Sequence, residues 1–197
     1  MRARPGRIRR KQMEALRDHL CQIGPPAPRR IEAVERPISF NDEMVRALLT
    51  GRKNQTRRLA GNEKCCPFGE PGDLLWVRER FAKAEDGRYV YAADSAQHHV
   101  RCRPAFHMPR AAARLLLRIT SVRRESLQSI RPDDARHEGF DPAQSGPSPR
   151  KWFAVLWDRI FTDTGTRWDD DPAVWVIRFE RVEATARPAR PRRRARA

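Results

Sequence analysis

The stretch GRKNQTRRL, residues 51–59, holds side chains whose types could do chemistry. Lys53 is one of five lysines among 41 basic residues, so the chain uses arginine almost everywhere else for positive charge. Arginine stays protonated at accessible pH, whereas a partly buried lysine can lose its proton and act as a base or nucleophile. Thr56 follows three residues later, and its hydroxyl becomes a nucleophile when a neighbouring base removes its proton. Lys53 and Thr56 are therefore a candidate pair of base and nucleophile.

The same stretch also fits a simpler binding role. Residues three apart share one face of a helix but alternate along a strand, so their spacing does not establish that Lys53 and Thr56 meet. In the alternative, Lys53 is a solvated or phosphate-contacting cation. Arg52, Arg57 and Arg58 are then partners for phosphate or carboxylate groups, or a solvated basic edge. Both interpretations stay open at this level.

A short helix is expected directly before this stretch, in SFNDEMVRALLTG. Ser39 or Asn41 can cap its first turn, and Asp42 and Glu43 suit that turn because it is the positive end of the helix dipole. Apolar residues follow at helical spacing, and Gly51 is a natural terminator. The candidate pair therefore straddles the end of a helix and the start of an extended segment.

The rest of the ordered region is predicted to hold several strands and two more helices. Strand-like runs bounded by Gly, Pro or Asp are GEPGDLLWVRERF, GRYVYAAD, RLLLRITSVRR and DPAVWVIRFERVE. Short helices are expected in RPDDARHEGF and KWFAVLWDRIF, with the aromatic side chains of the second in the core. Strands that follow one another without helices favour antiparallel pairing, and a small sheet usually curls or closes into a barrel. The predicted fold class is α+β, with a small β-barrel and flanking short helices.

The two ends of the chain are expected to lie outside this domain. The net charge is +16; residues 1–35 carry nine Lys or Arg against four Asp or Glu, and residues 184–197 carry six Arg and no acid. Proline and arginine without apolar periodicity cannot form a packed core. We expect a partly disordered basic arm at 1–35, a domain at 36–183 and a disordered Arg/Pro-rich tail at 184–197. Such arms attract nucleic acid, but the preference for arginine also fits GC-rich codon usage, and both explanations stay open.

Composition disfavours several classes of protein. There is no run of about eighteen apolar residues to cross a membrane, and the basic N-terminus lacks the apolar segment of a secretory signal. We therefore expect a cytoplasmic protein without a membrane partner. The four cysteines, Cys21, Cys65, Cys66 and Cys102, form no C-x-x-C pair, so reduced thiols are expected rather than a metal site. No metal or other cofactor is predicted, and the oligomeric state is left open.

Several motifs in a fixed order carry a resemblance to a known family. They are RPISFNDEMVRALLTGRKNQTRRL, CPFGEPGDLLWVRERF, RPAFHMPRAAARLLLRITSV, LQSIRPDDARHEGF, FAVLWDRIF and WVIRFERVE. From Arg36 to Glu183 the chain resembles the ASCH-domain proteins of the PUA-like superfamily, above all the uncharacterised forms found in bacteriophages and prophages. The resemblance implies a small PUA-like β-barrel with a helix-lined cleft. It also implies recognition of nucleic acid, RNA rather than DNA, or of a modified nucleoside.

The resemblance further implies roles for single residues. The family signature G-x-K-x-x-T-x-R falls on Gly51, Lys53, Thr56 and Arg58. Some family members are amidohydrolases that remove the acetyl group from 4-acetylcytidine, with that lysine, that threonine and a later glutamate, matched here by Glu138, as the catalytic set. In that mechanism Lys53 takes the proton of Thr56, and Thr56 attacks the amide carbonyl. Glu138 then passes a proton to the departing amine.

Four further residues are candidates to line the cleft and contact a base: Trp76, Arg78, Glu79 and His107. Trp76 also fits the core. Since the chain is much longer than the compact amidohydrolases, the leading hypothesis is recognition of nucleic acid or of a modified nucleoside. An amidohydrolase acting on an acylated base or nucleoside is the first alternative, and a phage accessory protein with a vestigial cleft is the second.

Overall fold

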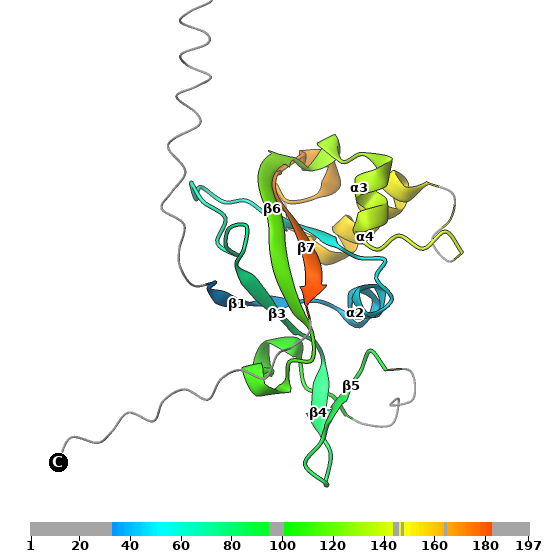
Figure 1. The fold of residues 1–197 in the computed structure, drawn as a ribbon. Coiled ribbons are helices and arrows are strands. Elements are labelled where there is room, and N and C mark those ends of the chain that lie inside the picture. Colours follow the sequence, from blue (N-terminus) through cyan, green and yellow to red (C-terminus); the bar gives the residue numbers. More distant parts are fainter. Residues whose placement is uncertain (1–32, 95–100, 144–145, 147, 164, 183–197) are drawn as a thin grey trace, which may run out of the picture. The chain divides into compact units, whose positions relative to one another are not determined.

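A five-stranded sheet forms the centre of the fold in the computed structural model (Figure 1). The model describes residues 33–94, 101–143, 146, 148–163 and 165–182, and all elements named below belong to residues 34–197, one of the two units into which the chain divides. The strand order is β1 (Glu35–Ser39), β3 (Leu74–Arg78), β6 (Leu116–Ser126), β7 (Ala173–Val182), β2 (Gln55–Leu59). The predicted basic arm and tail fall almost wholly outside the described residues, so they stay predictions.

The pairing of the strands corrects one expectation. Three neighbouring pairs are antiparallel as predicted, but β1 and β3 are parallel, with Glu35 opposite Leu74. A parallel pair needs a long crossover connection, usually containing a helix. The segment between β1 and β3 supplies one, because it contains a helix as well as β2. The sequence patterns did not predict β1 as a strand, so they could not predict this parallel pair.

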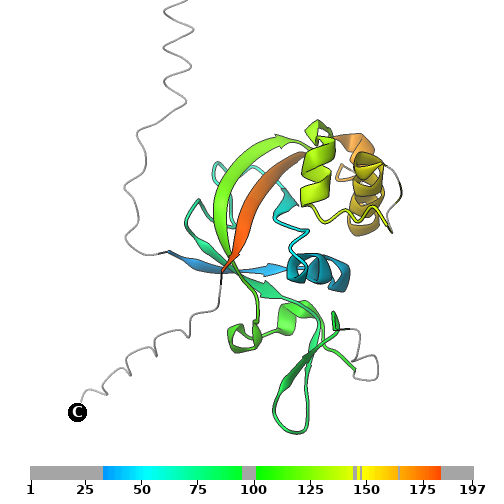
Figure 2. The same cartoon turned by 45° about the vertical axis from the view of Figure 1, so that its right-hand side comes forward.

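The sheet is strongly curved. Strands β6 and β7 pair over nearly their whole length and bend together in Figure 2, and the register shifts between Ile119 and Ser121. Such irregularities increase the local bend and twist of a sheet. In the described residues the ladder runs in a row from β1 to β2, and a side chain connects these edge strands: Nη2 of Arg58 donates to the carbonyl oxygen of Ser39 at 2.7 Å. The α+β class is confirmed.

Helix α2 (Asp42–Leu49) forms where the sequence predicts it. The side chain of Asn41 caps it by accepting a hydrogen bond from the Met44 backbone N–H at 2.8 Å. Its inner face buries Val45 and Leu48 in the main core. Gly51 follows with a φ of 75°, the left-handed conformation that ends helices and that glycine adopts without strain. The chain therefore turns sharply just before Lys53.

Two helices pack together at one end of β6 and β7 (Figures 1 and 2). Helix α3 (Pro132–His137) starts with Pro132 in its first turn, and α4 (Pro149–Ile160) is capped by the Ser148 side chain. Both predicted helices are confirmed. Phe153 and Trp157 of α4 join a second core cluster, which also contains Val174 of β7. This cluster fixes α4 against the sheet beside β2.

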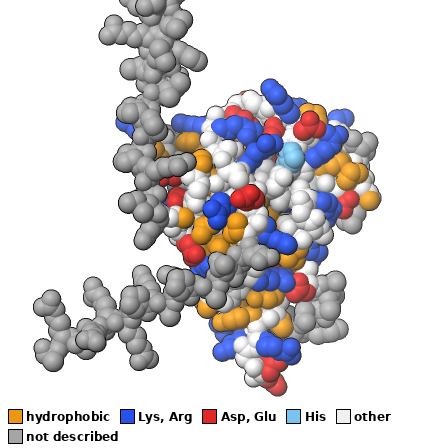
Figure 3. Space-filling model, in the orientation of Figure 1, with side chains coloured by type: hydrophobic (Ala, Val, Ile, Leu, Met, Phe, Trp, Pro, Cys, Tyr) orange, Lys and Arg blue, Asp and Glu red, His pale blue; other side chains and the backbone are white. Residues whose placement is uncertain are grey.

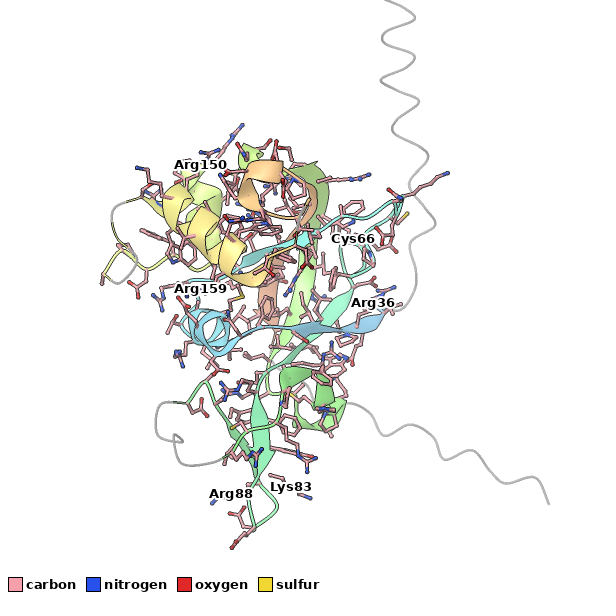
Figure 4. All side chains as sticks on the ribbon, turned by 180° about the vertical axis from the view of Figure 1, so that it is seen from behind. Arg36, Cys66, Lys83, Arg88, Arg150 and Arg159 are labelled. Carbon is pink, nitrogen blue, oxygen red and sulfur yellow. The ribbon has the colours of Figure 1, made fainter. Side chains whose placement is uncertain are left out.

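A separate two-stranded sheet pairs β4 (Phe81–Lys83) with β5 (Tyr89–Tyr91). Figure 4 shows Lys83 and Arg88 on this hairpin, away from α4, whose ends are marked by Arg150 and Arg159. The segment that follows contains the 3-10 helices η2 (Ala105–His107) and η3 (Arg110–Ala112). The backbone of Arg103 pairs with that of Phe81, which ties this segment to the hairpin.

Candidate functional site

A cavity of about 420 Å³ lies between β2, α4, the start of α2 and the segment before η2. Most of its wall is apolar or aromatic, from Phe40, Met44, Pro104, Ala105, Phe153, Leu156, Trp157, Ile160 and Phe161. Its polar groups come from Ser39, Asn41, Thr56, Arg57, Arg58, Arg80, Cys102 and Glu138. A largely apolar pocket of this size with a few converging polar groups is the usual form of a site for a small molecule.

The carboxylate of Glu138 is the centre of the polar side of the cavity. Nζ of Lys53 donates to Oε2 of Glu138 and to its backbone carbonyl, both at 2.9 Å. Nη1 of Arg57 donates to Oε1 of Glu138 at 3.1 Å. The side chains of Lys53 and Arg57 are fully buried and that of Glu138 is almost so. The structure therefore brings Lys53 and Glu138 into direct contact across 85 residues of sequence.

Arg57 also bonds to acidic groups on its other side. Its Nη2 lies 2.6 Å from Glu125 Oε1 and 3.7 Å from Asp134 Oδ2. These two carboxylates line a second, polar hollow, together with Arg123 and Arg178. Arg57 is therefore a buried cation shared by three carboxylates. Its hydrogen bond to Oε1 holds the Glu138 carboxylate in place.

Burial sets the protonation behaviour of the cations around Glu138. Burial lowers the pKa of Lys53 below its ordinary 10.5, and Arg58 and Arg57 act in the same direction, although Glu138 opposes the change. Burial also lowers the pKa of Arg58 to about 10, again opposed by Glu138, so Arg58 stays charged at neutral pH. Lys53 is thus a buried lysine whose amine is easier to deprotonate than that of an exposed lysine.

Thr56 lines the cavity but does not join the Lys53–Glu138 pair. In β2, Thr56 alternates with Gln55 and Arg57, so its side chain leaves the strand on the other face from Arg57. Within the described residues no hydrogen bond joins its hydroxyl to Lys53 or Glu138. Lys53 itself is not among the residues that line the cavity. Any proton transfer between Lys53 and Thr56 would therefore need an intermediary, and Glu138, which touches both the cavity and Lys53, is the available one.

The backbone places Glu138 opposite Lys53. Glu138 ends α3, and it forms an isolated antiparallel bridge with Lys53, next to a hydrogen bond of 3.0 Å from Asn54 N to His137 O. Gly139 then leaves the helix with a φ of 112°, and a Cβ there would lie 3.1 Å from that of Ala47. Only glycine combines this backbone with such a close approach.

Replacing Gly139 with alanine is expected to lower the free energy of unfolding by about 2–3 kcal/mol, because strained backbone and a tight contact coincide. Urea denaturation measures this loss. The matched control is Gly51→Ala, where φ is also positive but no atom lies within 4 Å of the added Cβ, so its cost is about 1 kcal/mol. Equal losses at the two positions would contradict a tight Gly139–Ala47 approach.

Asp134 lines the polar hollow and pairs there with Arg57 and Arg123. Burial raises the pKa of this carboxyl, but Arg57, Arg123 and further hydrogen bonds outweigh burial and leave the pKa below the ordinary 3.8. The stability that it contributes is therefore present above pH 3.8 and is lost as the pH falls through the lowered pKa.

Asp134→Asn is expected to reduce the free energy of unfolding at pH 7 by about 1–2 kcal/mol, because hydrogen bonds to charged groups are lost. It should also flatten the fall in stability below about pH 4. Urea denaturation at several pH values checks both effects. The neighbouring Asp133→Asn is the control, since that carboxylate is 83% exposed and its ion pair with Arg136 should contribute little.

Four of the predicted site residues lie away from the cavity. Gly51 borders a different hollow, and Arg52 is exposed and paired with Asp141. Trp76 and Arg78 are half-buried on β3, where Arg78 stacks over Trp76 and donates to Ser39 Oγ. These four residues do not line the cavity that contains Glu138.

Two more predicted residues have other surroundings. Glu79 is buried and forms a two-armed ion pair with Arg114, with both distances at 2.9 Å. Burial raises the pKa of Glu79 although Arg114 opposes this. Its contacts indicate a structural role beside β5. His107 is exposed on η2, two residues beyond the cavity-lining Ala105.

Sequence patterns missed most of the cavity wall. Phe153 and Trp157 were predicted as core, and they are both buried core residues and cavity walls. Phe40 and Ala105 carried no sequence signal for a site. Phe40 lies below the Lys53 and Arg58 cations, with its ring centroid 5.5 Å and 5.0 Å from their charged groups.

The described part of the chain contains no cluster of three or more His, Cys, Asp or Glu residues able to hold a metal ion. Nor does any helix there have the length and apolar character needed to cross a membrane. Cys65, Cys66 and Cys102 are free thiols.

No protein-family model and no curated protein matches the sequence. Among solved structures, the chain is similar to an ASCH domain from Lactobacillus crispatus, with 16% identity, a TM-score of 0.46 and coverage of 89% of this chain and 96% of that one. It is also similar to a protein of the DUF984 family from Enterococcus faecalis, with 13% identity, a TM-score of 0.44 and coverage of 91% and 98%.

Proposed function

We propose that the cavity recognises a nucleobase, either in nucleic acid or in a modified nucleoside. The observation that carries this proposal is an aromatic cavity whose polar side is the fixed carboxylate of Glu138 next to the guanidinium of Arg58. Base edges carry N–H donors beside ring-nitrogen or carbonyl acceptors. Glu138 can accept from such a donor, and an arginine N–H can donate to such an acceptor.

The hydrogen-bonding capacity of the cavity supports this match. Nε of Arg58 and Nε of Arg57 are buried and have no hydrogen-bond partner among the described residues. An arginine carries five N–H donors, and Arg58, which is half-buried and bonds in the structure to the Ser39 carbonyl, keeps donors for a ligand. Phe40, Trp157 and Phe161 supply flat faces for a base.

The position of the charges favours a base over a phosphate group at this place. Lys53 and Arg57 already bond to Glu138, and the wall is mostly apolar, which disfavours a doubly charged anion. Elsewhere basic side chains are spread over the surface among acidic and apolar ones, as Figure 3 shows for one face. Phosphate contacts would therefore lie outside the cavity.

Titration calorimetry with a panel of ordinary and modified nucleosides tests the proposal. The wild-type protein is expected to bind at least one of them, and Arg58→Met should weaken that binding about tenfold or more by removing a charged donor. A panel without any binding, with an intact fold, would favour the vestigial cleft of a phage accessory protein instead.

One observation favours an amidohydrolase as a second candidate. Lys53 has a lowered pKa, it contacts Glu138 at 2.9 Å, and Glu138 shares the cavity with Thr56. In this reaction the Thr56 oxygen forms a bond to the amide carbonyl carbon while its proton passes by way of Glu138 toward Lys53. The C–N bond then breaks as the amine takes up a proton, and water releases the acyl group from Thr56.

Turnover of 4-acetylcytidine and related acylated nucleosides, followed by chromatography, separates the two candidates. Lys53→Arg keeps the charge but removes the amine that can be deprotonated, so it should abolish turnover while leaving much of the binding. Binding without turnover in the wild-type protein would leave the recognition role alone.

A further inference from the structure

An exposed aromatic pair lies next to the cavity. Phe106 is 63% exposed, the largest value among the exposed large hydrophobic side chains of the described residues. Its ring lies against the imidazole of His107, with centroids 4.0 Å apart and planes inclined by 38°. Single exposed apolar side chains are common, but two adjacent exposed rings can stack on a base, so this surface is a candidate for contact with another molecule.

The pair directly follows, along the chain, a segment that lines the cavity. Phe106 directly follows Ala105, and Ala105, Pro104 and Cys102 line the cavity from this segment. On the α4 side, Ile160 lines the cavity and is also 45% exposed, so the wall reaches the surface there too. A ligand that extends out of the cavity over this segment would meet the Phe106 ring.

Three arginines lie on the cavity wall or on the segment before Phe106. Arg80 lines the cavity with a side chain that is 56% exposed, although Asp42 pairs with it. Arg101 and Arg103 are exposed on the segment that leads to Phe106. An exposed ring beside a cavity for a base, with arginines on the same segment and on the cavity wall, is a combination that binds a single-stranded polynucleotide, because aromatic faces stack bases and cations contact phosphates.

We propose that Phe106 and His107 form a stacking platform for the nucleotide next to the one in the cavity, so that the ligand is a single strand of nucleic acid rather than a free nucleoside. This inference rests on the proposed function, since it needs a base in the cavity. Arginines alone would suit a protein with an acidic surface equally well. The aromatic pair beside the cavity favours nucleic acid, because a second base could stack on Phe106 and His107 while the first lies against the aromatic wall of the cavity.

The experiment compares Phe106→Ala with the wild-type full chain. Binding of labelled oligoribonucleotides and oligodeoxyribonucleotides eight units long is measured by fluorescence anisotropy at fixed salt, and binding of the matching nucleosides by calorimetry. Loss of one stacked base is expected to weaken oligonucleotide binding about tenfold and to leave nucleoside binding unchanged. Val155→Ala is the matched control: Val155 is 62% exposed, but it lies on α4 about half a turn away from the cavity-lining residues.

The comparison of variants is decisive because arginine-rich termini would attract any oligonucleotide. An unchanged oligonucleotide affinity in Phe106→Ala, with nucleoside binding intact, overturns the platform and leaves the cavity proposal standing. Absence of both nucleoside and oligonucleotide binding in the wild type overturns the proposed function and the platform together. A preference for one of the two sugar types identifies the strand as RNA or DNA.

Discussion

Replacing Glu138 with alanine should lower the free energy of unfolding by about 3–5 kcal/mol, because it leaves two buried cations without their shared carboxylate. Nζ of Lys53 and Nη1 of Arg57 lie 2.9 Å and 3.1 Å from this carboxylate. The loss should be smaller at high pH. Without Glu138 the pKa of Lys53 falls further, so the folded state can release the proton that the unfolded state still holds. Stability then rises with pH up to the ordinary lysine value near 10.5.

Urea denaturation at pH 7 and pH 9 measures both effects. Glu138→Gln is a second variant that preserves shape, and it should lose less stability because its amide oxygen still accepts a hydrogen bond. The control is Glu85→Ala, at an exposed position, which should change stability by no more than about 0.5 kcal/mol. A loss below about 1 kcal/mol for Glu138→Ala would contradict a buried ion-pair centre.

Filling the cavity should abolish ligand binding without unfolding the protein. Ala105 lines the cavity and is only half-buried, so Ala105→Trp can place its indole where the ligand would bind. We expect binding of any nucleoside found by screening to weaken about 100-fold or more, since a ligand cannot share space already occupied by packed atoms. Calorimetry with that nucleoside gives the result directly.

A second cavity-filling variant and a control variant complete this experiment. Leu156→Trp fills the same cavity from α4, in case the indole at position 105 turns to solvent. Val155→Trp adds the same bulk at an exposed position on the other side of α4 and should leave binding unchanged. Normal affinity in both cavity-filling variants would mean that the ligand binds elsewhere.

The helices could be predicted from sequence because their signals are local. Asn41 caps α2, Pro132 starts α3, and Gly51 and Gly139 end these helices where the patterns placed them. The parallel pairing of β1 with β3 could not be predicted in this way. It depends on a crossover that joins segments nearly 40 residues apart, which no local pattern specifies.

For the site as well, local residue types could be predicted from the sequence, but long-range contacts could not. Lys53 was informative by type, because it is a lysine in an arginine-rich chain, but no pattern brings Glu138 to it across 85 residues. The family resemblance suggested that pairing. Arg57 was predicted as a partner for phosphate or carboxylate groups, or as part of a solvated basic edge; its side chain is buried and bonds to three carboxylates of this chain. Its burial follows from its place on a strand covered by α3 and α4, which its residue type does not reveal.

The most direct test of a base-binding cavity is a crystal structure of the protein with a nucleoside that binds in the calorimetric screen. We expect the base inside the cavity, with its hydrogen-bonding edge within about 3.2 Å of Glu138 and Arg58 and its face against an aromatic ring of the wall. A base bound instead at the polar hollow around Arg123 and Asp134, or on the surface near Arg52, would contradict the account.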